Sequence, residues 1–428
     1  MITLDNAKQT LSQPSLANCP YVFIVFIYEL VVKQSEEEIQ IIIEHWIRAL
    51  SIKLGWIHDF NKLVAEYTTN FFIFEAFLAS SKLLKTFTGH NGLVYSIDYS
   101  TFDGGQFIYS GSHDNTICVW DVETNSRIQV FNGHSEPVYS VKFSPYHYHN
   151  HRRHVICSSS SDQTIRFWYI KDNKQFQIFE NNFGWVGDIE FSPFNGGRYL
   201  CSGYGNSKIN LSDVETSKSL HVLNGHLGSI LCVNFSPLQS NNNASNESNS
   251  IGIIGGNGYT ICSGSLDKTI RIWDIETAKQ LSVFEGHGSF VNSVKYGSNE
   301  LINTILSGSA DKSVRLWDIR SGQQIQVFNG HTNSINSVEY SPFLVKNKEI
   351  DISSNVLCSG SFDNTIRFWD ARSDKNELHV IKGAVEKDDG IYALKFLQLK
   401  NKEKKSKSDN GGISLCYSSY NGLIHIWG

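Results

Sequence analysis

The chain has 428 residues, of which 40% are hydrophobic and 18% are charged. This balance is typical of a folded globular protein and argues against a largely disordered chain. The formal net charge is -5, whereas proteins that bind nucleic acids or anionic membranes are usually basic. We therefore expect no specific nucleic-acid binding and no attachment to an anionic surface.

The first 80 residues show no sign of a membrane anchor or a secretory signal. Their longest apolar run, residues 21–32, is interrupted by Glu29 and is shorter than the roughly 18 residues that a membrane-spanning helix needs. A polar stretch precedes it, which makes a poor signal peptide. We expect no membrane insertion and an intracellular location, in the cytoplasm, the nucleus or both.

A helical hairpin is predicted at about residues 36–67, within an N-terminal segment of residues 1–80. Residues 35–38, SEEE, form a capping box, and apolar residues then recur at helical spacing from Ile39 to Leu50. A second apolar face follows from Trp56 to Tyr67, after a break at Gly55. This apolar surface must be covered, either by the rest of the chain or by a partner.

A repeated unit fills residues 81–428. Five copies of a twelve-residue pattern read SGSHDNTICVWD at 110–121, SSSSDQTIRFWY at 158–169, SGSLDKTIRIWD at 263–274, SGSADKSVRLWD at 307–318 and SGSFDNTIRFWD at 359–370. A Gly-His pair precedes each copy, and degenerate copies at 202–213 and 417–427 bring the number of units to seven. Between them lie segments such as VYSVKFSP at 138–145, which alternate with the period of a β-strand.

These residues resemble the WD-repeat family, whose repeats form the four-stranded blades of a β-propeller. The resemblance implies an all-β, seven-bladed propeller over residues 81–428, preceded by the short α-helical segment. Residues 82–87, KLLKTF, match the fourth strands KQLSVF at 279–284 and QQIQVF at 323–328. We expect this N-terminal strand to complete the last blade and close the ring, which removes an open sheet edge.

Five units carry a His, a Ser, an Asp and a Trp at matched positions. The sets are His90, Ser110, Asp114 and Trp120; His134, Ser158, Asp162 and Trp168; His226, Ser263, Asp267 and Trp273; His287, Ser307, Asp311 and Trp317; and His331, Ser359, Asp363 and Trp369. A catalytic triad does not recur five times at fixed strand spacing. The resemblance implies instead a structural hydrogen-bond chain that satisfies the buried indole N–H of each Trp.

The loops that carry the Gly-His pair and the Asp turn should lie at one end of each blade, on a surface we call the top face. Residues at the start of each first strand and before each Asp should point to it. Aromatic and apolar side chains are frequent there: Tyr95, His113, Tyr139, Trp185, Leu231, Leu266, Phe290, Phe362, Tyr392 and Tyr420. Exposed aromatic residues around a central opening predict a binding site for a partner protein or peptide.

The longer insertions, 146–154, 238–258, 343–355 and 398–412, should lie on the opposite side, the bottom rim. The His-rich segment YHYHNHRRH at 146–154 is interpreted as a solvated loop rather than a metal site, because a flexible loop offers no defined ligand geometry. WDIR at 317–320 and WDAR at 369–372 match the ending found in substrate receptors that dock on a cullin–RING ubiquitin ligase adaptor, with Arg320 and Arg372 as the contact residues.

Three functions therefore remain open. The first is a non-catalytic interaction scaffold, monomeric within a larger complex, that binds proteins or peptides on the top face. The second is a cullin–RING ligase substrate receptor that uses Arg320 and Arg372. The third, a propeller enzyme, is disfavoured because no cluster of acid, base and nucleophile stands outside the repeats. No cofactor and no metal are expected.

Overall fold

The computed structural model divides the chain into two compact units, residues 1–70 and 71–428. It describes Phe74, Phe77, Leu78 and residues 81–428, apart from 103–104, 181–182, 237–258, 298–300, 344, 347–351, 354, 373–376, 384–388 and 400–412. The predicted helical hairpin at 36–67 lies outside the described residues. The described helices are short, and none has the length and apolar composition of a membrane-spanning helix.

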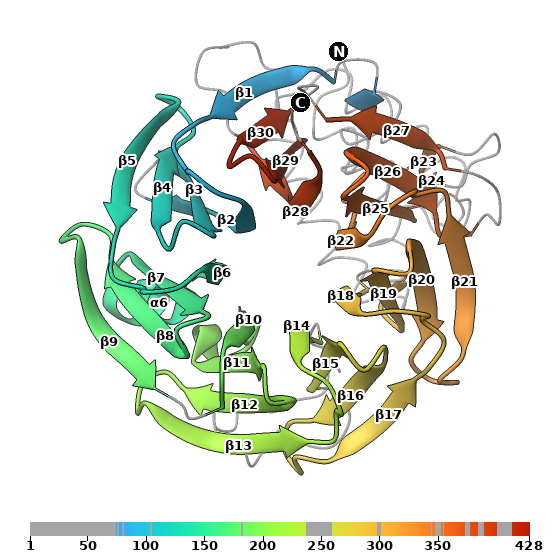
Figure 1. Ribbon diagram of the computed structural model, residues 1–428, viewed down its shortest axis with the longest axis horizontal. Helices are drawn as coiled ribbons and strands as arrows, with labels where there is room; N and C mark the ends of the chain where they lie inside the picture. Colours follow the sequence, from blue (N-terminus) through green and yellow to red (C-terminus); the bar gives the residue numbers. More distant parts are fainter. Residues whose placement is uncertain are drawn as a thin grey trace, which may run out of the picture. The chain divides into compact units, whose positions relative to one another are not determined.

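Seven four-stranded antiparallel sheets form a ring, which confirms the predicted seven-bladed propeller (Figure 1). Blade 1 contains β2 (Val94–Phe102), β3 (Gly105–Ser112), β4 (Ile117–Asp121) and β5 (Ser126–Phe131). Blade 2 contains β6 (Val138–Phe143), β7 (Val155–Ser160), β8 (Thr164–Tyr169) and β9 (Lys174–Glu180). Blade 3 contains β10 (Val186–Phe191), β11 (Tyr199–Tyr204), β12 (Lys208–Asp213) and β13 (Lys218–Asn224). Blade 4 contains β14 (Ile230–Phe235), β15 (Thr260–Ser265), β16 (Ile270–Asp274) and β17 (Gln280–Phe284).

The remaining three blades complete the ring. Blade 5 contains β18 (Val291–Tyr296), β19 (Thr304–Ser309), β20 (Ser313–Asp318) and β21 (Gln324–Asn329). Blade 6 contains β22 (Ile335–Tyr340), β25 (Val356–Ser361), β26 (Thr365–Asp370) and β27 (His379–Lys382). Blade 7 contains β28 (Ile391–Gln398), β29 (Ile413–Ser419), β30 (Ile424–Trp427) and β1 (Leu83–Phe87). The first strand of each repeat lies innermost, next to the central axis (Figure 1).

Blade 7 joins two distant parts of the chain. Strand β1 pairs antiparallel with β30, and Phe87 lies opposite Ile424. Just before β1, the ring of Phe77 stacks on Phe343 with centroids 4.4 Å apart, and Phe74 lies 5.0 Å from Phe368. The residues preceding β1 are therefore held by the apolar core of blade 6.

Small residues in the second strands let neighbouring blades pack closely. A Cβ on Gly111 of β3 would lie 2.7 Å from methyl groups of both Val138 and Val141 in the next blade. Gly308 of β19 meets Ile335 and Val338 of the following blade in the same way. The Ser-Gly pair of the repeat thus removes side-chain volume where the face of one blade contacts the next, as dense interior packing requires.

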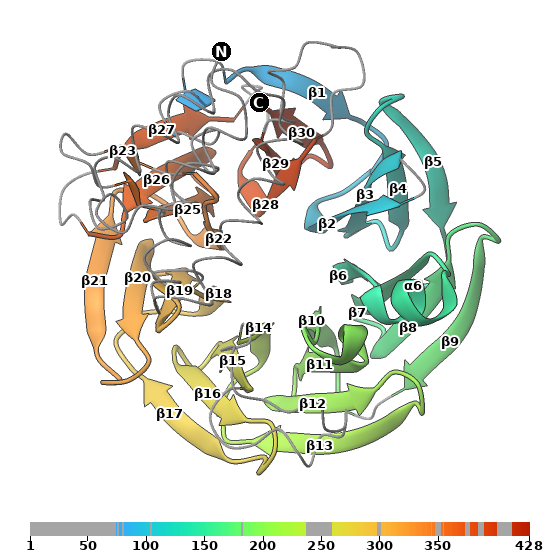
Figure 2. The ribbon, with the colours of Figure 1, turned by 180° about the vertical axis from the view of Figure 1, so that it is seen from behind.

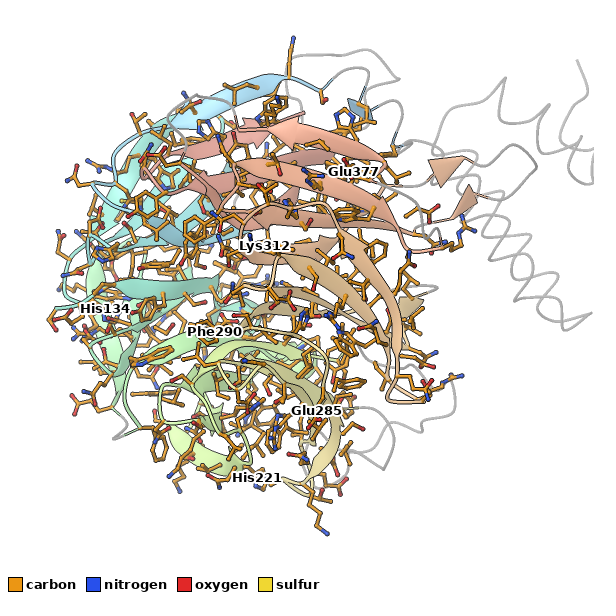
Figure 3. The ribbon with its side chains drawn as sticks, turned by 45° about the vertical axis from the view of Figure 1, so that its right-hand side comes forward. His134, His221, Glu285, Phe290, Lys312 and Glu377 are labelled. Atoms are coloured by element: carbon orange, nitrogen blue, oxygen red, sulfur yellow. The ribbon has the colours of Figure 1, made fainter. Side chains whose placement is uncertain are left out.

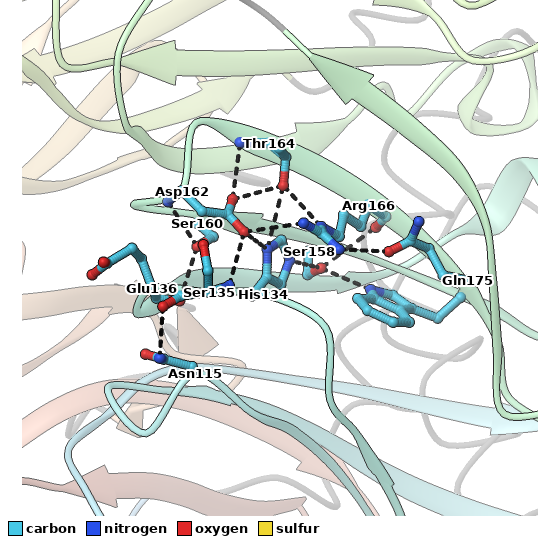
Figure 4. A network of polar contacts seen from close by, with 11 residues as sticks. Asn115, His134, Ser135, Glu136, Ser158, Ser160, Asp162, Thr164, Arg166 and Gln175 are labelled. Atoms are coloured by element: carbon cyan, nitrogen blue, oxygen red, sulfur yellow. Dashed lines mark hydrogen bonds and ion pairs between the residues drawn. The ribbon is translucent and has the colours of Figure 1, made fainter.

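Each intact repeat builds the same hydrogen-bond chain, shown for blade 2 in Figure 4. The indole N–H of Trp168 donates to Ser158 Oγ at 2.8 Å, and Ser158 Oγ lies 2.8 Å from His134 Nε2. His134 Nδ1 is 2.7 Å from an oxygen of Asp162. The corresponding Trp–Ser, Ser–His and His–Asp distances in blades 1, 4, 5 and 6 all lie between 2.7 and 3.0 Å. The Ser hydroxyl accepts from Trp in every case. Where the imidazole is neutral, the hydroxyl donates to His Nε2 and His Nδ1 donates to Asp, whereas a protonated imidazole donates at both nitrogens.

The Asp also shapes the turn between the second and third strands. Asp162 Oδ1 accepts the amide of Thr164 at 3.0 Å, across Gln163, which has a left-handed backbone with φ 70°. The equivalent residues of the other turns are Asn115, Ser207, Lys268, Lys312, Asn364 and Gly422, and all have positive φ. A residue other than Gly or Asn is strained in this conformation. In blades 2, 4 and 5, where the residue is Gln163, Lys268 or Lys312, the Asp therefore stabilises a turn that this residue alone does not favour.

Blades 3 and 7 lack the Trp–Ser–His–Asp hydrogen-bond chain and have other polar contacts in its place. In blade 3, Asn210 donates to Ser212 Oγ at 3.0 Å and accepts from Ser219 at 2.5 Å. In blade 7, His425 Nδ1 lies 3.0 Å from Thr86 Oγ1. Other hydrogen bonds therefore replace the chain in blade 3, whereas in blade 7 the His425–Thr86 contact leaves the buried indole nitrogen of Trp427 without a hydrogen-bond partner among the described residues.

The prediction of a solvated loop at 146–154 is wrong. Residues Pro145–His151 form the helix α6, which lies near the short helix η1 (Asn195–Gly197) on one face of the ring (Figure 2). Tyr146, His147 and His154 are buried, and His147 Nδ1 lies 2.8 Å from Ser144 Oγ. The aromatic side chains of this insertion pack against the blade, and the polar composition of the segment did not indicate this packing.

We expect Asp267→Ala to lower the free energy of unfolding by roughly 1–3 kcal/mol, because His226 and the turn amide of Thr269 lose their acceptor in a buried site. Denaturant unfolding of the full chain measures this. Asp172→Ala, which removes an exposed turn carboxylate, should change stability little and is the matched control. Equal stability of the two variants would contradict a structural role for the hydrogen-bond chain.

Acidification should also destabilise the fold. Burial lowers the pKa of His134, His226 and His287 even though each lies beside an Asp, and a group with a lowered folded pKa contributes stability that is lost as the pH falls below its unfolded value. His90 differs, since hydrogen bonds with Asp114 and Cys118 overcome burial and raise its pKa to about 9. The stability that His90 contributes is fully present below its pKa in the unfolded chain, about 6.5. It therefore stays constant over the pH range in which the other three histidines lower the stability. The free energy of unfolding should therefore fall between about pH 6.5 and 5; a constant or rising value over that window would refute this.

Candidate partner-binding face

Tyrosines of three adjacent blades meet at the top of the central channel. Tyr95, Tyr139 and Tyr392 each occupy the second residue of an innermost strand, β2, β6 and β28. The ring of Tyr95 lies 5.0 Å from Tyr139 and 5.1 Å from Tyr392, both edge to face. Burial raises the pKa of Tyr392 to about 12, so its hydroxyl stays neutral and can donate a hydrogen bond at physiological pH.

Further aromatic residues extend this group to both sides. Trp185 of blade 3 lies 5.6 Å from Tyr139, edge to face. Phe362 of blade 6 lies 5.2 Å from Tyr392 and 6.3 Å from Tyr420. We call Trp185, Tyr139, Tyr95, Tyr392 and Phe362 the aromatic arc. It runs from blade 3 through blades 2, 1 and 7 to blade 6, a continuous edge-to-face arrangement that holds the rings in place.

The arc borders a cavity of about 510 Å³ in the centre of the ring. This volume is within the range of sites that hold a ligand or a side chain of a partner. Of the ten residues predicted for the top face, seven line the cavity: Tyr95, Tyr139, Trp185, Leu231, Phe290, Phe362 and Tyr392. The other three, His113, Leu266 and Tyr420, do not line it and belong to the surrounding surface. Phe290, labelled in Figure 3, combines both positions, since the residue is 44% exposed and also lines the cavity.

Charged residues line the deeper wall of the channel, a feature that the sequence reasoning missed. The fifth residue of each innermost strand is, from blade 1 to blade 7, Asp98, Lys142, Glu190, Asn234, Lys295, Glu339 and Lys395. Ion pairs join neighbouring blades: Lys395 to Asp98 at 2.9 Å, Lys142 to Glu190 at 2.5 Å and Lys295 to Glu339 at 2.8 Å. Aligning the seven first strands would have revealed this alternation of charge.

The bottom rim carries Arg320 and Arg372. Both are exposed, and each backbone amide donates to the preceding Asp side chain at 3.0 Å. Arg372 Nε also lies 3.9 Å from Asp370. The two guanidinium groups are available to a partner, while the contacts that they make within the chain are local to their turns.

Comparison with known proteins identifies the repeat. The family described as WD domain, G-beta repeat, matches residues 81–121, 125–169, 217–274, 278–318 and 322–370, which make up more than half of the chain. The chain belongs to the WD-repeat family. The unmatched stretches, 170–216 and 371–428, include the inner strands of blades 3 and 7, the two WD-repeat blades that lack the Trp–Ser–His–Asp chain.

Individual relatives are similar to this chain in sequence over parts of its length. Protein tipD of Dictyostelium discoideum is 25% identical over 375 residues, covering 81% of this chain and 47% of tipD. WD repeat protein iqw1 of Schizosaccharomyces pombe is 41% identical over 71 residues, or 16% of this chain and 8% of iqw1. The peroxisomal targeting signal 2 receptor of Mus musculus is 38% identical over 63 residues, or 15% of this chain and 20% of the receptor. The chain thus spans less than half the length of each of these relatives.

Proposed function

We propose that this WD-repeat propeller is a non-catalytic interaction scaffold that binds partner peptides or domains on its top face. The observation that carries the proposal is the aromatic arc around the mouth of the central cavity. WD-repeat propellers generally bind other proteins, and here the arc supplies the type of side chain that dominates binding energy at protein interfaces.

The exposure of these residues supports the proposal. Phe290 and Tyr420 are 44% and 49% exposed, whereas the tryptophans of the five hydrogen-bond chains are buried. Tyr95, Tyr139 and Trp185 are partly exposed at the cavity. Large apolar rings that contribute little to a blade core and remain accessible to solvent are typical of a partner site.

The five Ser-His-Asp sets support a non-catalytic role. Each Ser is completely buried, so no substrate carbonyl can reach its oxygen. The same oxygen accepts the Trp indole N–H, and each imidazole lies within 3.0 Å of its Asp. A nucleophile needs access to a substrate as well as a neighbouring base.

An intracellular site of action, in the cytoplasm, the nucleus or both, is part of the proposal. Seven cysteines among the described residues are buried and unpaired: Cys118, Cys157, Cys201, Cys232, Cys262, Cys358 and Cys416. Burial raises the pKa of Cys157, Cys201 and Cys358, which keeps these thiols protonated. Buried free thiols of this kind suit a reducing compartment.

A second candidate function is docking on a cullin–RING ligase adaptor through the bottom rim. Its supporting observation is the exposure of Arg320 and Arg372 in equivalent turns of blades 5 and 6. The Asp–Arg contact of Arg372 also has a local structural explanation, so this candidate ranks second.

Two variants of the full chain separate the candidates in affinity capture from the source cell. Tyr139→Ala combined with Phe290→Ala should weaken binding of a top-face partner by about 30-fold or more, as hot-spot truncations do. Arg320→Ala combined with Arg372→Ala is the matched double variant on the opposite surface. Thermal unfolding of both verifies that the propeller remains folded.

The pattern of loss decides between the surfaces. Partners that are lost with the top-face variant and retained with the bottom-rim variant support the scaffold proposal. Loss of a cullin–RING adaptor with the bottom-rim variant alone would move the ligase candidate to first place. Partners that bind both variants as well as the unaltered protein would contradict both.

A further inference from the structure

Blade 3 departs from the repeat at several positions that meet at the channel mouth. Gly187 occupies the position that is Tyr, Leu or Asn in the other blades, and Gly205 precedes the turn. A Cβ on Gly187 would lie 2.8 Å from the ring of Trp185, and a Cβ on Gly205 would overlap its indole nitrogen. The absence of side chains at these two glycines therefore leaves the space that the Trp185 indole occupies at the rim of the cavity.

Asp188 follows Gly187 in β10 and replaces a small residue of the repeat. The other blades have Ser96, Ser140, Cys232, Ser293, Ser337 and Ala393 at this position. The Ser hydroxyls join blades: Ser96, Ser293 and Ser337 each accept a backbone amide of the next blade at 3.2 Å. Asp188 does the same through one oxygen, which accepts Val233 N–H at 3.1 Å, while its other oxygen accepts Ile189 N–H at 2.9 Å. A Ser would satisfy the contact with Val233, so the blade does not need the charge.

Within the described part of the chain, the ion pairs of the channel wall leave one carboxylate without a lysine partner. Each of the three lysines, Lys142, Lys295 and Lys395, forms an ion pair with a carboxylate at the fifth strand position. Asp188 lines the cavity together with Glu190 and Glu339, whereas Asp98, the partner of Lys395, is not among the lining residues. Among the described residues Asp188 takes part in no ion pair within 4.0 Å, so it is the one of these four carboxylates without a lysine partner at that distance, although the charge of Lys142 acts on it.

The environment of Asp188 penalises its negative charge. Burial raises the pKa of its carboxyl although Lys142 opposes the shift, and Glu190 adds to it. A cation that enters the cavity would relieve this penalty. It would also lie among Trp185, Tyr139 and Tyr95, whose electron-rich faces attract cations.

We propose that the channel mouth at blade 3 receives an arginine side chain of the bound partner, with its guanidinium group paired with Asp188 and flanked by Trp185 and Tyr139. The inference rests on the proposed function of the top face and names the chemistry that this face recognises. A planar guanidinium group presents parallel N–H donors to a carboxylate and stacks on aromatic rings. A single carboxylate with aromatic neighbours is a poor set of ligands for a metal ion.

The test uses an array of random octapeptides with one fixed central residue: arginine, lysine, citrulline or norleucine. Citrulline has nearly the shape of arginine and no charge. The full chain should prefer arginine over citrulline by at least about tenfold, the scale expected for a partly desolvated charge pair with cation–π contacts. Asp188→Ser should abolish this preference and keep the hydrogen bond to Val233. Glu136→Gln, which removes one exposed charge before β6 on the top face, is the matched control and should keep the preference.

A second variant and a second measurement guard against misfolding. Asp188→Asn keeps the size of the side chain, and both Asp188 variants should unfold at the same temperature as the unaltered protein or higher, because a buried charge is removed. Peptides that bind without preference for arginine over citrulline would overturn this inference and leave the scaffold proposal intact. A preference for lysine over arginine would overturn the guanidinium assignment. No binding of any peptide would contradict both proposals.

Discussion

A buried indole N–H needs a hydrogen-bond acceptor, and most of this propeller is organised around supplying one. In five blades Ser accepts from Trp, the imidazole of His joins that Ser to an Asp, and the Asp accepts from His. The chain thereby connects the third strand, the second strand, the loop before the blade and the turn between strands. The loop and the turn both reach the top face, so the same contacts that satisfy the interior also fix the position of the surface residues. This support holds Tyr95, Tyr139 and Phe362 of the aromatic arc, which belong to blades 1, 2 and 6. Trp185 and Tyr392 belong to blades 3 and 7, which lack the hydrogen-bond chain, and their rings are held by edge-to-face contacts with their neighbours in the arc.

Much of the fold could be predicted because its signals repeat. The Trp, Ser, His and Asp positions recur in register, and the number of units gives the number of blades. The sequence also pointed to the aromatic residues, since strand alternation says which side chains face the channel. His113, Leu266 and Tyr420 were grouped with the cavity residues because residue position along a strand predicts the face but not the distance from the axis.

Other features could not be read along the chain. The ion pairs Lys142–Glu190 and Lys295–Glu339 join residues about one repeat apart, so a charge in one strand looks like an isolated polar residue until the ring is closed. The helix α6 was mistaken for a solvated loop because its contacts are with blade surfaces that no local pattern reveals. Asp188 was overlooked for a related reason. A single change in a degenerate repeat looks like random sequence variation, and only the ion pairs of the whole channel wall show that Asp188 has no lysine partner among the described residues.

The sheet of blade 7 has a kinetic consequence. Its outer strand β1 and its inner strands are separated by most of the chain, and the contact between Thr86 and His425 spans 339 positions. Contacts so remote in sequence form late, since the intervening chain loses conformational entropy before they give any stabilisation. Blades 1 to 6 can each assemble from consecutive strands during synthesis, whereas the seventh waits for residues 391–427. Until then strand β1 and the face of blade 1 that packs against blade 7 have no neighbour, and this stage of folding is the one most open to wrong association between chains.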